Sequence, residues 1–360
     1  MPRIQLATKC SLLAFTAFAV LASSGCGGSS PSTTGSGPTT TYSSASGRLV
    51  GSGSTLVEPL VSVWGAPVKA ALGTEVTYSG VGSGAGIVAI STRTVDFGAS
   101  DAPLTSDQSS GCHGCVQIPW ALSATTLSYN LPNVKNGLRL TGGVIAGIYL
   151  GSITSWNDPQ IRQLNPGVKL PSLHIQPVFR SEGSGDTYAF TDYLSRVSNA
   201  WKTKVGTATS VAFPTGTGAK GNSGVAGDIS RSEGAIGYVS AAYALPNGLH
   251  VAAVQNASGA FVQPAIASIQ AAGATVTAVP ANNELHIVDP PAGHPAAYPI
   301  STFTYVIVPR QTAKAAELRS FIDWAVTDGQ AAEYTKPQVF APIPAVVRDA
   351  AKKTTAQLTK

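Results

Sequence analysis

Short β-rich runs alternate with helical patterns along the roughly 310 residues that follow position 47, and this alternation leaves few folds open. Chains that alternate strands with helices are typical of open α/β sheets, and this length exceeds one typical core. We therefore expect an α/β protein with two lobes. Expected strands cover residues 75–79, 95–98, 175–179, 235–239 and 303–309, and expected helices cover 57–71, 87–92, 143–149, 187–197 and 312–327.

The first 47 residues differ in composition from the rest. Arg3 and Lys9 precede a short apolar run at residues 12–22, which is typical of a secretory signal peptide, expected over residues 1–25. Cys26 follows Ser-Gly, as in a bacterial lipobox, although Ser23 stands where Leu is usual; ordinary cleavage that leaves a free thiol is the alternative. Residues 26–47 are expected to be a lipid-anchored Gly/Ser/Thr/Pro linker. We expect an exported lipoprotein on the outer face of the cell membrane, or in the periplasm.

Charge indicates little about a partner. The net charge is +5, and removal of residues 1–25 takes away Arg3 and Lys9 and no acids, which leaves +3. No Lys/Arg-rich block is present, so a nucleic-acid groove is not expected. Only 11% of residues are charged and 38 are Gly, a composition suited to binding through backbone amides and hydroxyls.

Two cysteines remain outside the leader. Cys112 and Cys115 flank His113 in a Gly-Cys-His-Gly-Cys stretch. In an exported protein this pair predicts a local disulfide; a redox pair or a metal site is the alternative. A metal would need more ligands than His113 offers, and Val116 stands where a haem-attachment motif requires His. We expect no metal.

Three turns rich in Gly and Ser each open an expected helix: residues 51–56, 80–86 and 180–186. A helix N-terminus has unpaired N–H groups and a partial positive charge, so it attracts anions, and Gly lets a ligand approach the backbone. Arg180 adds a planar fork suited to an oxyanion. Each turn alone is more often a simple helix cap, but three turns with one Arg favour a small tetrahedral anion. The dinucleotide fingerprint and the P-loop are absent, and no cofactor is expected.

These turns, together with further segments in the same order, resemble the PstS family, the phosphate-binding proteins of bacterial phosphate ABC transporters. The likeness extends from about residue 50 to about residue 345. It lies in residues 51–56, 80–86, 94–104, 148–151, 156–158, 164–167, 180–187, 234–239 and 321–325.

The resemblance implies a two-lobed periplasmic-binding-protein fold of type II, the Venus-flytrap type, in which each lobe is an open sheet flanked by helices. Lobe 1 would hold residues 48–129 plus 300–360, and lobe 2 residues 130–299. The implied function is high-affinity binding of inorganic phosphate outside the cytoplasm and its delivery to the permease of an ABC transporter. The expected protein is a monomer, a binding protein rather than an enzyme, whose partners are phosphate, the permease and, through the lipid anchor, the membrane.

The resemblance also implies the site residues, position by position. Backbone N–H groups and hydroxyls would bind phosphate, Arg180 would pair with it, Glu182 would orient Arg180, and Asp101 would accept a phosphate proton. The implied phosphate ligands are Thr55, Leu56, Ser83, Asp101, Arg180, Ser184, Gly185 and Asp186. Leu56 replaces the usual Phe, a change of little effect because that contact is made by the main chain.

An acid in an anion site serves discrimination. Phosphate near neutral pH still has a P–OH proton and sulfate has none, so a buried Asp101 carboxylate can accept a hydrogen bond only from phosphate. Leaving such buried groups unpaired costs on the order of 1–3 kcal/mol. The alternative is that Asp101 caps a turn before Pro103, a common role for Asp.

Asp186 departs from the family, which usually has Thr at this position. We favour an Asp that caps the helix N-terminus and points away from the ligand, with its backbone N–H still binding phosphate. The alternative is a second acceptor in the pocket, which would favour the monobasic anion and weaken binding as pH rises.

Different classes of function remain open at this level. Residues 98–102 approach the nucleophile elbow of serine hydrolases, but the last position is Ala102 and Pro103 interrupts the expected helix. A secreted phosphatase would need a metal cluster or a nucleophile–base pair, and neither is recognisable. The same fold could also bind sulfate, molybdate or another oxyanion, or serve as a surface adhesin or phosphate sensor.

Overall fold

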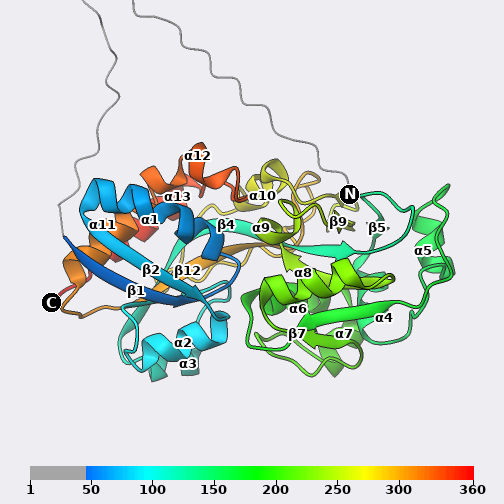
Figure 1. Cartoon of the computed structure of the whole chain (residues 1–360), viewed down its shortest axis with the longest axis horizontal. Coiled ribbons are helices and arrows are strands. Elements are labelled where there is room, and N and C mark those ends of the chain that lie inside the picture. Colours follow the sequence, from blue (N-terminus) through cyan, green and yellow to red (C-terminus); the bar gives the residue numbers. More distant parts are fainter. Residues whose placement is uncertain (1–45) are drawn as a thin grey trace, which may run out of the picture. The chain divides into compact units, whose positions relative to one another are not determined.

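The computed structural model describes residues 46–360; the predicted signal peptide, Cys26 and the linker up to residue 45 lie outside this range. A mixed sheet runs through the structure in the strand order β2-β1-β3-β12-β4-β8-β6-β7, with β9 paired to β4 (Figure 1). A smaller sheet has the order β11-β10-β5. The strands are β1 Gly47–Gly53, β2 Thr74–Gly80, β3 Phe97–Ser100, β4 Cys115–Tyr129, β5 Arg139–Leu140, β6 Gln176–Arg180, β7 Thr217–Ala219, β8 Ala235–Ser240, β9 His250–Val251, β10 Ala253–Gln255, β11 Phe261–Val262 and β12 Ser301–Pro309.

Helices flank both halves of the large sheet. In the first half α1, α2 and α11 pack on strands β1 to β3, and in the second half α8 packs on β6, β7 and β8 (Figure 1). Within residues 46–360 no helix has the length and apolar character that crossing a membrane requires. The helices are α1 Glu58–Leu72, α2 Ser83–Ser91, α3 Ser106–Gly111, α4 Gly142–Tyr149, α5 Pro159–Leu164, α6 Gly185–Val197, α7 Asn199–Lys204, α8 Gly221–Arg231, α9 Ala241–Ala244, α10 Ile266–Gly273, α11 Ala315–Ala325, α12 Ala332–Thr335 and α13 Ala345–Thr355, with a 3₁₀ turn, η1, at Asp328–Gln330.

Strand β4 joins the two halves. Its first part, up to Ala124, pairs antiparallel with β12, and its second part, from Thr125 to Tyr129, pairs antiparallel with β8. The change of partner therefore occurs at Ala124–Thr125, where the Thr125 N–H also donates to the carbonyl of Ile300 at 2.9 Å. The α/β fold with two lobes is confirmed. We refer below to the lobe built on β2, β1, β3 and β12 as the first lobe, and to that built on β8, β6 and β7 as the second.

The predicted elements correspond to observed ones, with shifted ends. The structure starts α2 at Ser83 and α6 at Gly185, so both helices begin inside the Gly/Ser turns rather than after them. The longest strand, β4, was not predicted. It contains Pro119, which lacks a backbone donor and usually argues against a central strand. The ladder with β12 accommodates it by a register shift between Thr304 and Tyr305, opposite Pro119 and Ala121.

Two aromatic clusters mark the cores of the lobes. In the first lobe the ring of Phe321 lies 6.5 Å from Trp64, 5.6 Å from Phe97 and 5.9 Å from Trp120, centroid to centroid. In the second lobe Tyr238 stacks on Phe190 at 4.5 Å, and Tyr149, Trp201 and Phe213 complete the cluster. Both clusters include side chains from strands of the large sheet, Phe97 and Trp120 in the first lobe and Tyr238 in the second.

We expect Phe321→Ala to lower the free energy of unfolding by about 3–5 kcal/mol, because it opens a cavity among three large rings. Urea unfolding followed by tryptophan fluorescence measures the loss. The control is Val88→Ala in α2, since Val88 is 63% exposed and its truncation is expected to cost less than about 0.5 kcal/mol. Equal effects of the two substitutions would contradict this assignment of the core.

Candidate functional site

Four helices begin at one place between the two halves of the sheet. The turns before α1 and α2 come from the first lobe, and those before α6 and α8 from the second. Hydrogen bonds connect them: the Gly185 N–H donates to Ser83 Oγ at 3.1 Å, the Gly84 N–H to the Gly183 carbonyl at 3.0 Å, and Asn222 Nδ2 to Thr55 Oγ1 at 2.9 Å. The arrangement concentrates helix N-termini, each with a partial positive charge, around one point.

Asp101 lies at the end of β3 among hydroxyl donors. Ser54 Oγ is 2.6 Å from both carboxylate oxygens, and Ser83 Oγ is 3.5 Å from Oδ2. The carboxylate also touches the start of α6, where a Cβ added at Gly185 would lie 2.4 Å from Asp101 Cβ. Position 185 therefore requires Gly. Asp101 does not cap the turn before Pro103, because its side chain faces the helix starts.

Arg180 ends β6 and is almost completely buried, with 4% of its surface exposed. Nε donates to Glu182 Oε1 at 2.8 Å and Nη2 donates to the same oxygen, while Nη1 donates to Asp186 Oδ2 at 3.0 Å. Glu182 thus lies where an orienting residue is expected, and its Oε1 also accepts from the Gly221 N–H at 3.1 Å. The backbone N–H of Arg180 donates to the Tyr238 hydroxyl, which belongs to the aromatic core of the second lobe.

Asp186 is where the structure corrects the sequence analysis. Its side chain does not cap α6: the cap is Ser184, whose Oγ accepts from the backbone N–H groups of Asp186 and Thr187. The Asp186 carboxylate instead points toward Arg180 and accepts from Thr125 Oγ1 at 2.7 Å and from Asn222 Nδ2 at 2.8 Å. An acid in the first turn of α6 still has a favourable interaction with the helix dipole. The preferred interpretation, in which the Asp186 side chain caps the helix, is wrong.

The structure brings all of the predicted site residues into one connected cluster. Thr55 is connected through the Asn222 side chain to Asp186, which pairs with Arg180. The Leu56 N–H donates to Ser54 Oγ at 3.0 Å, and Ser54 in turn donates to Asp101. Ser83 then connects Asp101 to Gly185.

Sequence analysis did not single out Ser54, Thr125 or Asn222. Asn222 had a usable signal, because residues 220–224 form a fourth Gly- and Ser-containing turn at the start of a helix. Thr125 had none, since it lies within the unpredicted strand β4.

Burial and repulsion from neighbouring acids govern the pKa values of the acids in this site. Burial, together with the charge of Asp186, raises the pKa of Asp101 to about 8, although hydrogen bonds from Ser54 and the charge of Arg180 oppose the rise. Burial also raises the pKa of Asp186, against Arg180 and the donors Thr125 and Asn222. For Arg180, burial lowers the pKa, but Asp186 and Glu182 outweigh burial and the net pKa is raised. Arg180 therefore remains charged, and the site tends to take up protons on its acids.

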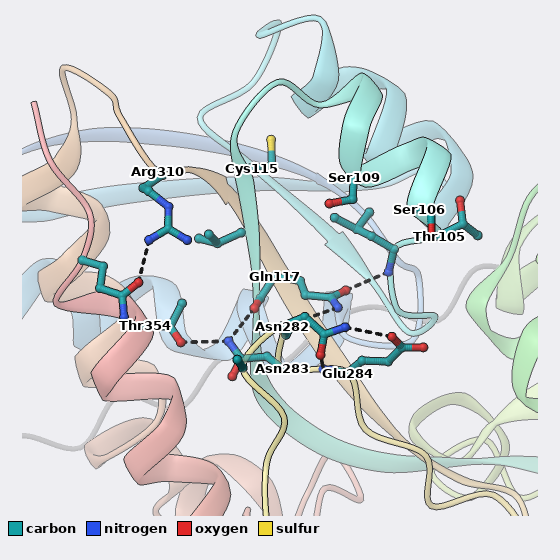
Figure 2. Close-up of a pocket in the computed structure, with 14 residues that line it drawn as sticks. Thr105, Ser106, Ser109, Cys115, Gln117, Asn282, Asn283, Glu284, Arg310 and Thr354 are labelled. Carbon is teal, nitrogen blue, oxygen red and sulfur yellow. Dashed lines mark hydrogen bonds between the residues drawn. The ribbon is translucent and has the colours of Figure 1, made fainter.

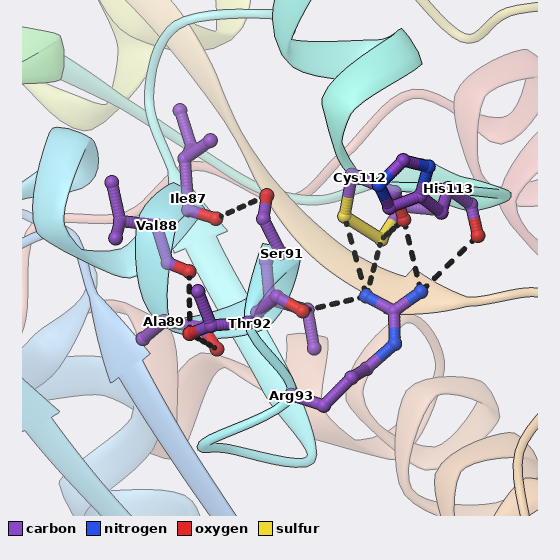
Figure 3. Close-up of a disulfide and its surroundings, with 10 residues drawn as sticks. Ile87, Val88, Ala89, Ser91, Thr92, Arg93, Cys112 and His113 are labelled. Carbon is purple, nitrogen blue, oxygen red and sulfur yellow. Dashed lines mark hydrogen bonds between the residues drawn. A yellow bond between two sulfur atoms is a disulfide. The ribbon is translucent and has the colours of Figure 1, made fainter.

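The predicted disulfide is present. Cys112 and Cys115 are joined at the end of α3, and Figure 3 shows the guanidinium of Arg93 facing the pair. Arg93 donates to the carbonyls of Ile90, Cys112 and His113. The disulfide loop is thereby fastened to the end of α2, the helix whose first residue is Ser83.

A separate cavity of about 490 Å³ lies between α3, the start of β4 and the end of α13 (Figure 2). Gln117 crosses it, accepting from the Leu104 N–H at 2.7 Å and donating to the Asn282 carbonyl at 3.0 Å. Arg310 at its edge donates to Gln357. None of the predicted phosphate ligands lines this cavity.

Two enzyme hypotheses find no support in residues 46–360. Ser100, the candidate hydrolase nucleophile, is buried and its hydroxyl donates to the Ala102 carbonyl at 2.7 Å. No group of three or more His, Cys, Asp and Glu side chains in this range is arranged to hold a metal ion.

We expect the stability of ligand-free protein to depend on the charge of Asp101. Folding raises the pKa of Asp101, so the folded protein keeps the Asp101 proton to higher pH than the unfolded chain does. The contribution of Asp101 to stability is therefore complete below about pH 4. It falls as pH rises toward 8, by up to about 1.4 kcal/mol per pH unit. Asp101→Asn removes this titration, so the variant gains stability relative to wild type as pH rises. Urea unfolding of both proteins at pH 5, 6.5 and 8 measures the difference; a difference that does not change with pH would contradict the burial of this acid.

Comparison with known proteins points in one direction. A family model described as a PBP superfamily domain matches residues 35–329. A phosphate-binding protein PstS of Xylella fastidiosa is 42% identical over 287 residues, which cover 79% of this chain and 78% of that protein. The PstS of Pasteurella multocida is 38% identical, covering 79% and 83%, and that of Methanocaldococcus jannaschii is 34% identical, covering 73% and 74%.

Solved structures agree on the fold. A high-affinity periplasmic phosphate-binding protein (PfluDING) bound with phosphate superimposes with a TM-score of 0.68 at 22% identity, covering 85% of this chain and 93% of that chain. A phosphate-binding protein from Stenotrophomonas maltophilia gives 0.62 at 19% identity, with the same coverage. At these identities the structures establish the two-lobed fold alone, whereas the sequence relatives extend over most of both chains. The chain belongs to the PstS family of phosphate-binding proteins, within the PBP superfamily.

Proposed function

We propose that this protein binds inorganic phosphate between its two lobes and delivers it to the permease of an ABC transporter, without catalysing a reaction. The observation that carries the proposal is the convergence of four helix starts on Arg180 and Asp101, two buried residues of opposite charge type at the ends of β6 and β3. The names of the sequence relatives, all phosphate-binding proteins, support the choice of anion.

Neutral donors do most of the binding in this site. Glu182 and Asp186 already neutralise the charge of Arg180. Arg180 therefore contributes oriented hydrogen-bond donors to the site more than it contributes net positive charge. The remaining hydrogen bonds to phosphate oxygens come from backbone N–H groups and hydroxyls. The Leu56 and Gly185 N–H groups, which donate to Ser54 and Ser83 Oγ in this structure, would change partner to the anion, and the hydroxyls of Thr55, Ser83 and Ser184 would donate to it. This arrangement suits an anion whose charge changes with pH, because neutral N–H and O–H donors can bind both the monobasic and the dibasic form of phosphate.

Asp101 supplies the selectivity. As a carboxylate it accepts a hydrogen bond from a P–OH group, and as a neutral acid it donates to any oxyanion. With a pKa raised to about 8, both states are populated over the physiological range, so selectivity is a function of pH.

Closure of the lobes over phosphate couples binding to recognition by the permease. The lobes are proposed to have bounds near 48–129 plus 300–360 and 130–299, with β4 as one of the crossings between them. The mature chain is proposed to act as a monomer, exported through residues 1–25 and held at the outer face of the membrane by a lipid on Cys26.

We expect wild type to bind phosphate in calorimetry, with a preference over sulfate that grows from pH 6 to pH 9 as Asp101 loses its proton. Asp101→Asn leaves an amide that can donate to sulfate, so its preference is expected to be at least about tenfold smaller at pH 8 and nearly independent of pH. Competition titrations of phosphate against sulfate and molybdate measure both. Tighter binding of sulfate or molybdate by wild type would overturn phosphate as the ligand, and hydrolysis of a generic phosphomonoester would overturn the assignment as a binding protein.

Asp186 is proposed to be a second acceptor for phosphate. Three of its four lone-pair positions are filled by Thr125, Arg180 and Asn222, which leaves one on Oδ1. A second acceptor favours the monobasic anion, so wild-type affinity for phosphate is expected to fall on the order of tenfold from pH 5 to pH 8.

Asp186→Asn is expected to flatten this pH dependence, because its amide no longer requires a second P–OH. The matched control is Asp192→Asn, on the same helix, where Asp192 pairs with Arg196 instead of facing the site. Calorimetry at pH 5, 6.5 and 8 compares the three proteins. Parallel pH profiles for wild type and Asp186→Asn would show that Asp186 has no contact with the ligand.

A further inference from the structure

A pair of side chains outside the proposed phosphate ligands joins the two lobes. The hydroxyl of Tyr243, in α9 of the second lobe, donates to Glu58 Oε2 at 3.0 Å; Glu58 lies in the first turn of α1 in the first lobe. The same helix start already has an interlobe contact through Thr55 and Asn222. The start of α1 is thus the place where the second lobe closes on the first at two points, one inside the proposed site and one beside it.

The Glu58 carboxylate is held in position by its own lobe. Its Oε1 accepts from the Gly80 N–H at 2.9 Å, at the end of β2, and a Cβ at position 80 would lie 2.3 Å from Oε2. Only Gly at this position lets the carboxylate sit flat against the strand end. No ion pair within residues 46–360 includes Glu58, so its second oxygen is directed at Tyr243 without competition from a cation.

Tyr243 is equally well placed to donate. Burial raises the pKa of its hydroxyl, and the charge and hydrogen bond of Glu58 raise it further, so the hydroxyl keeps its proton. Its helix, α9, follows β8 directly and packs on α8 and β4, which ties Tyr243 to the element that carries Asn222 and to the crossing strand. Movement of the second lobe as a body would therefore carry Tyr243 and Asn222 together.

We propose that the Glu58–Tyr243 hydrogen bond is a latch that stabilises the closed form and thereby raises affinity for the anion without touching it. The inference rests on the proposed function and adds two positioning residues to it. A hydrogen bond to a charged acceptor that exists only when the lobes are closed shifts the equilibrium toward closure by the free energy of that bond. For a partly exposed pair, we expect its loss to weaken phosphate binding about 5- to 20-fold.

The test is a double-mutant cycle on the full mature chain, with Tyr243→Phe, Glu58→Gln and both together. Tyr243→Phe keeps the ring and its packing, so the melting temperature of the ligand-free protein is expected to stay close to that of wild type. Calorimetry is expected to show about 5- to 20-fold weaker binding, and stopped-flow fluorescence is expected to place most of the change in the dissociation rate constant. The double variant is expected to bind no more weakly than the weaker single variant, since Tyr243→Phe removes and Glu58→Gln weakens the same contact.

The matched control is Tyr334→Phe, because Tyr334 is a tyrosine of α12 whose ring packs on Trp324 within the first lobe. Its affinity is expected to remain within twofold of wild type. Affinity of Tyr243→Phe within twofold of wild type, or additive effects of the two single substitutions, would overturn the latch.

Failure of the proposed function has a different signature. If wild type prefers another oxyanion, phosphate is excluded as the ligand, and the same cycle run with that anion still tests the latch because neither side chain contacts the ligand.

Discussion

The buried guanidinium of Arg180 is the constraint on which the site depends. A charge that is 4% exposed is tolerated only with paired and hydrogen-bonded partners, and Glu182 and Asp186 provide them from the turn and the helix that follow β6. Removing one partner would leave the remaining charges buried and uncompensated. Thr125, Asn222 and Tyr238 then orient these groups, so residues from β4, α8 and β8 must all be in place before this cluster of side chains forms.

The sheet makes this possible by bringing helix starts to one point from both lobes. Strand β4 belongs to both halves, and its change of partner at Ala124–Thr125 places Thr125 directly beside Asp186. The same strand thus connects the lobes and supplies a donor to the site. A change in the angle between the lobes would alter the separation between Thr55 and Asn222 and that between Ser83 and Gly185, because each of these pairs spans the lobes.

Two acids can lie in a proposed anion site because their carboxyl groups take up protons, which reduces their repulsion of the anion. Burial raises the pKa of Asp101 and of Asp186, so the proposed binding of an anion at this site would bring a proton that keeps the total charge low. Selectivity and pH dependence then arise from one cause. The proposed latch between Glu58 and Tyr243 lies outside this proton balance, so it would change affinity through closure while the chemistry of recognition stays the same.

Sequence alone determined the fold class and predicted a helix at each Gly/Ser turn, because these turns and apolar periodicity are local patterns. The resemblance to PstS proposed roles for Asp101 and Arg180. Sequence alone could not determine the direction of the Asp186 side chain, because the neighbouring residues allow both a helix cap and a salt bridge to Arg180. The hydrogen bonds from Thr125 and Asn222, which lie in distant segments, decide between the two. Sequence analysis also missed β4, since Pro119 and the mixed Ser/Thr composition hide a strand that is central only when β12 and β8 flank it. Local backbone preference depends on neighbouring residues, so the sequence predicts it. The partner of a buried charge depends on which distant segments the sheet brings together, so only the tertiary structure decides it.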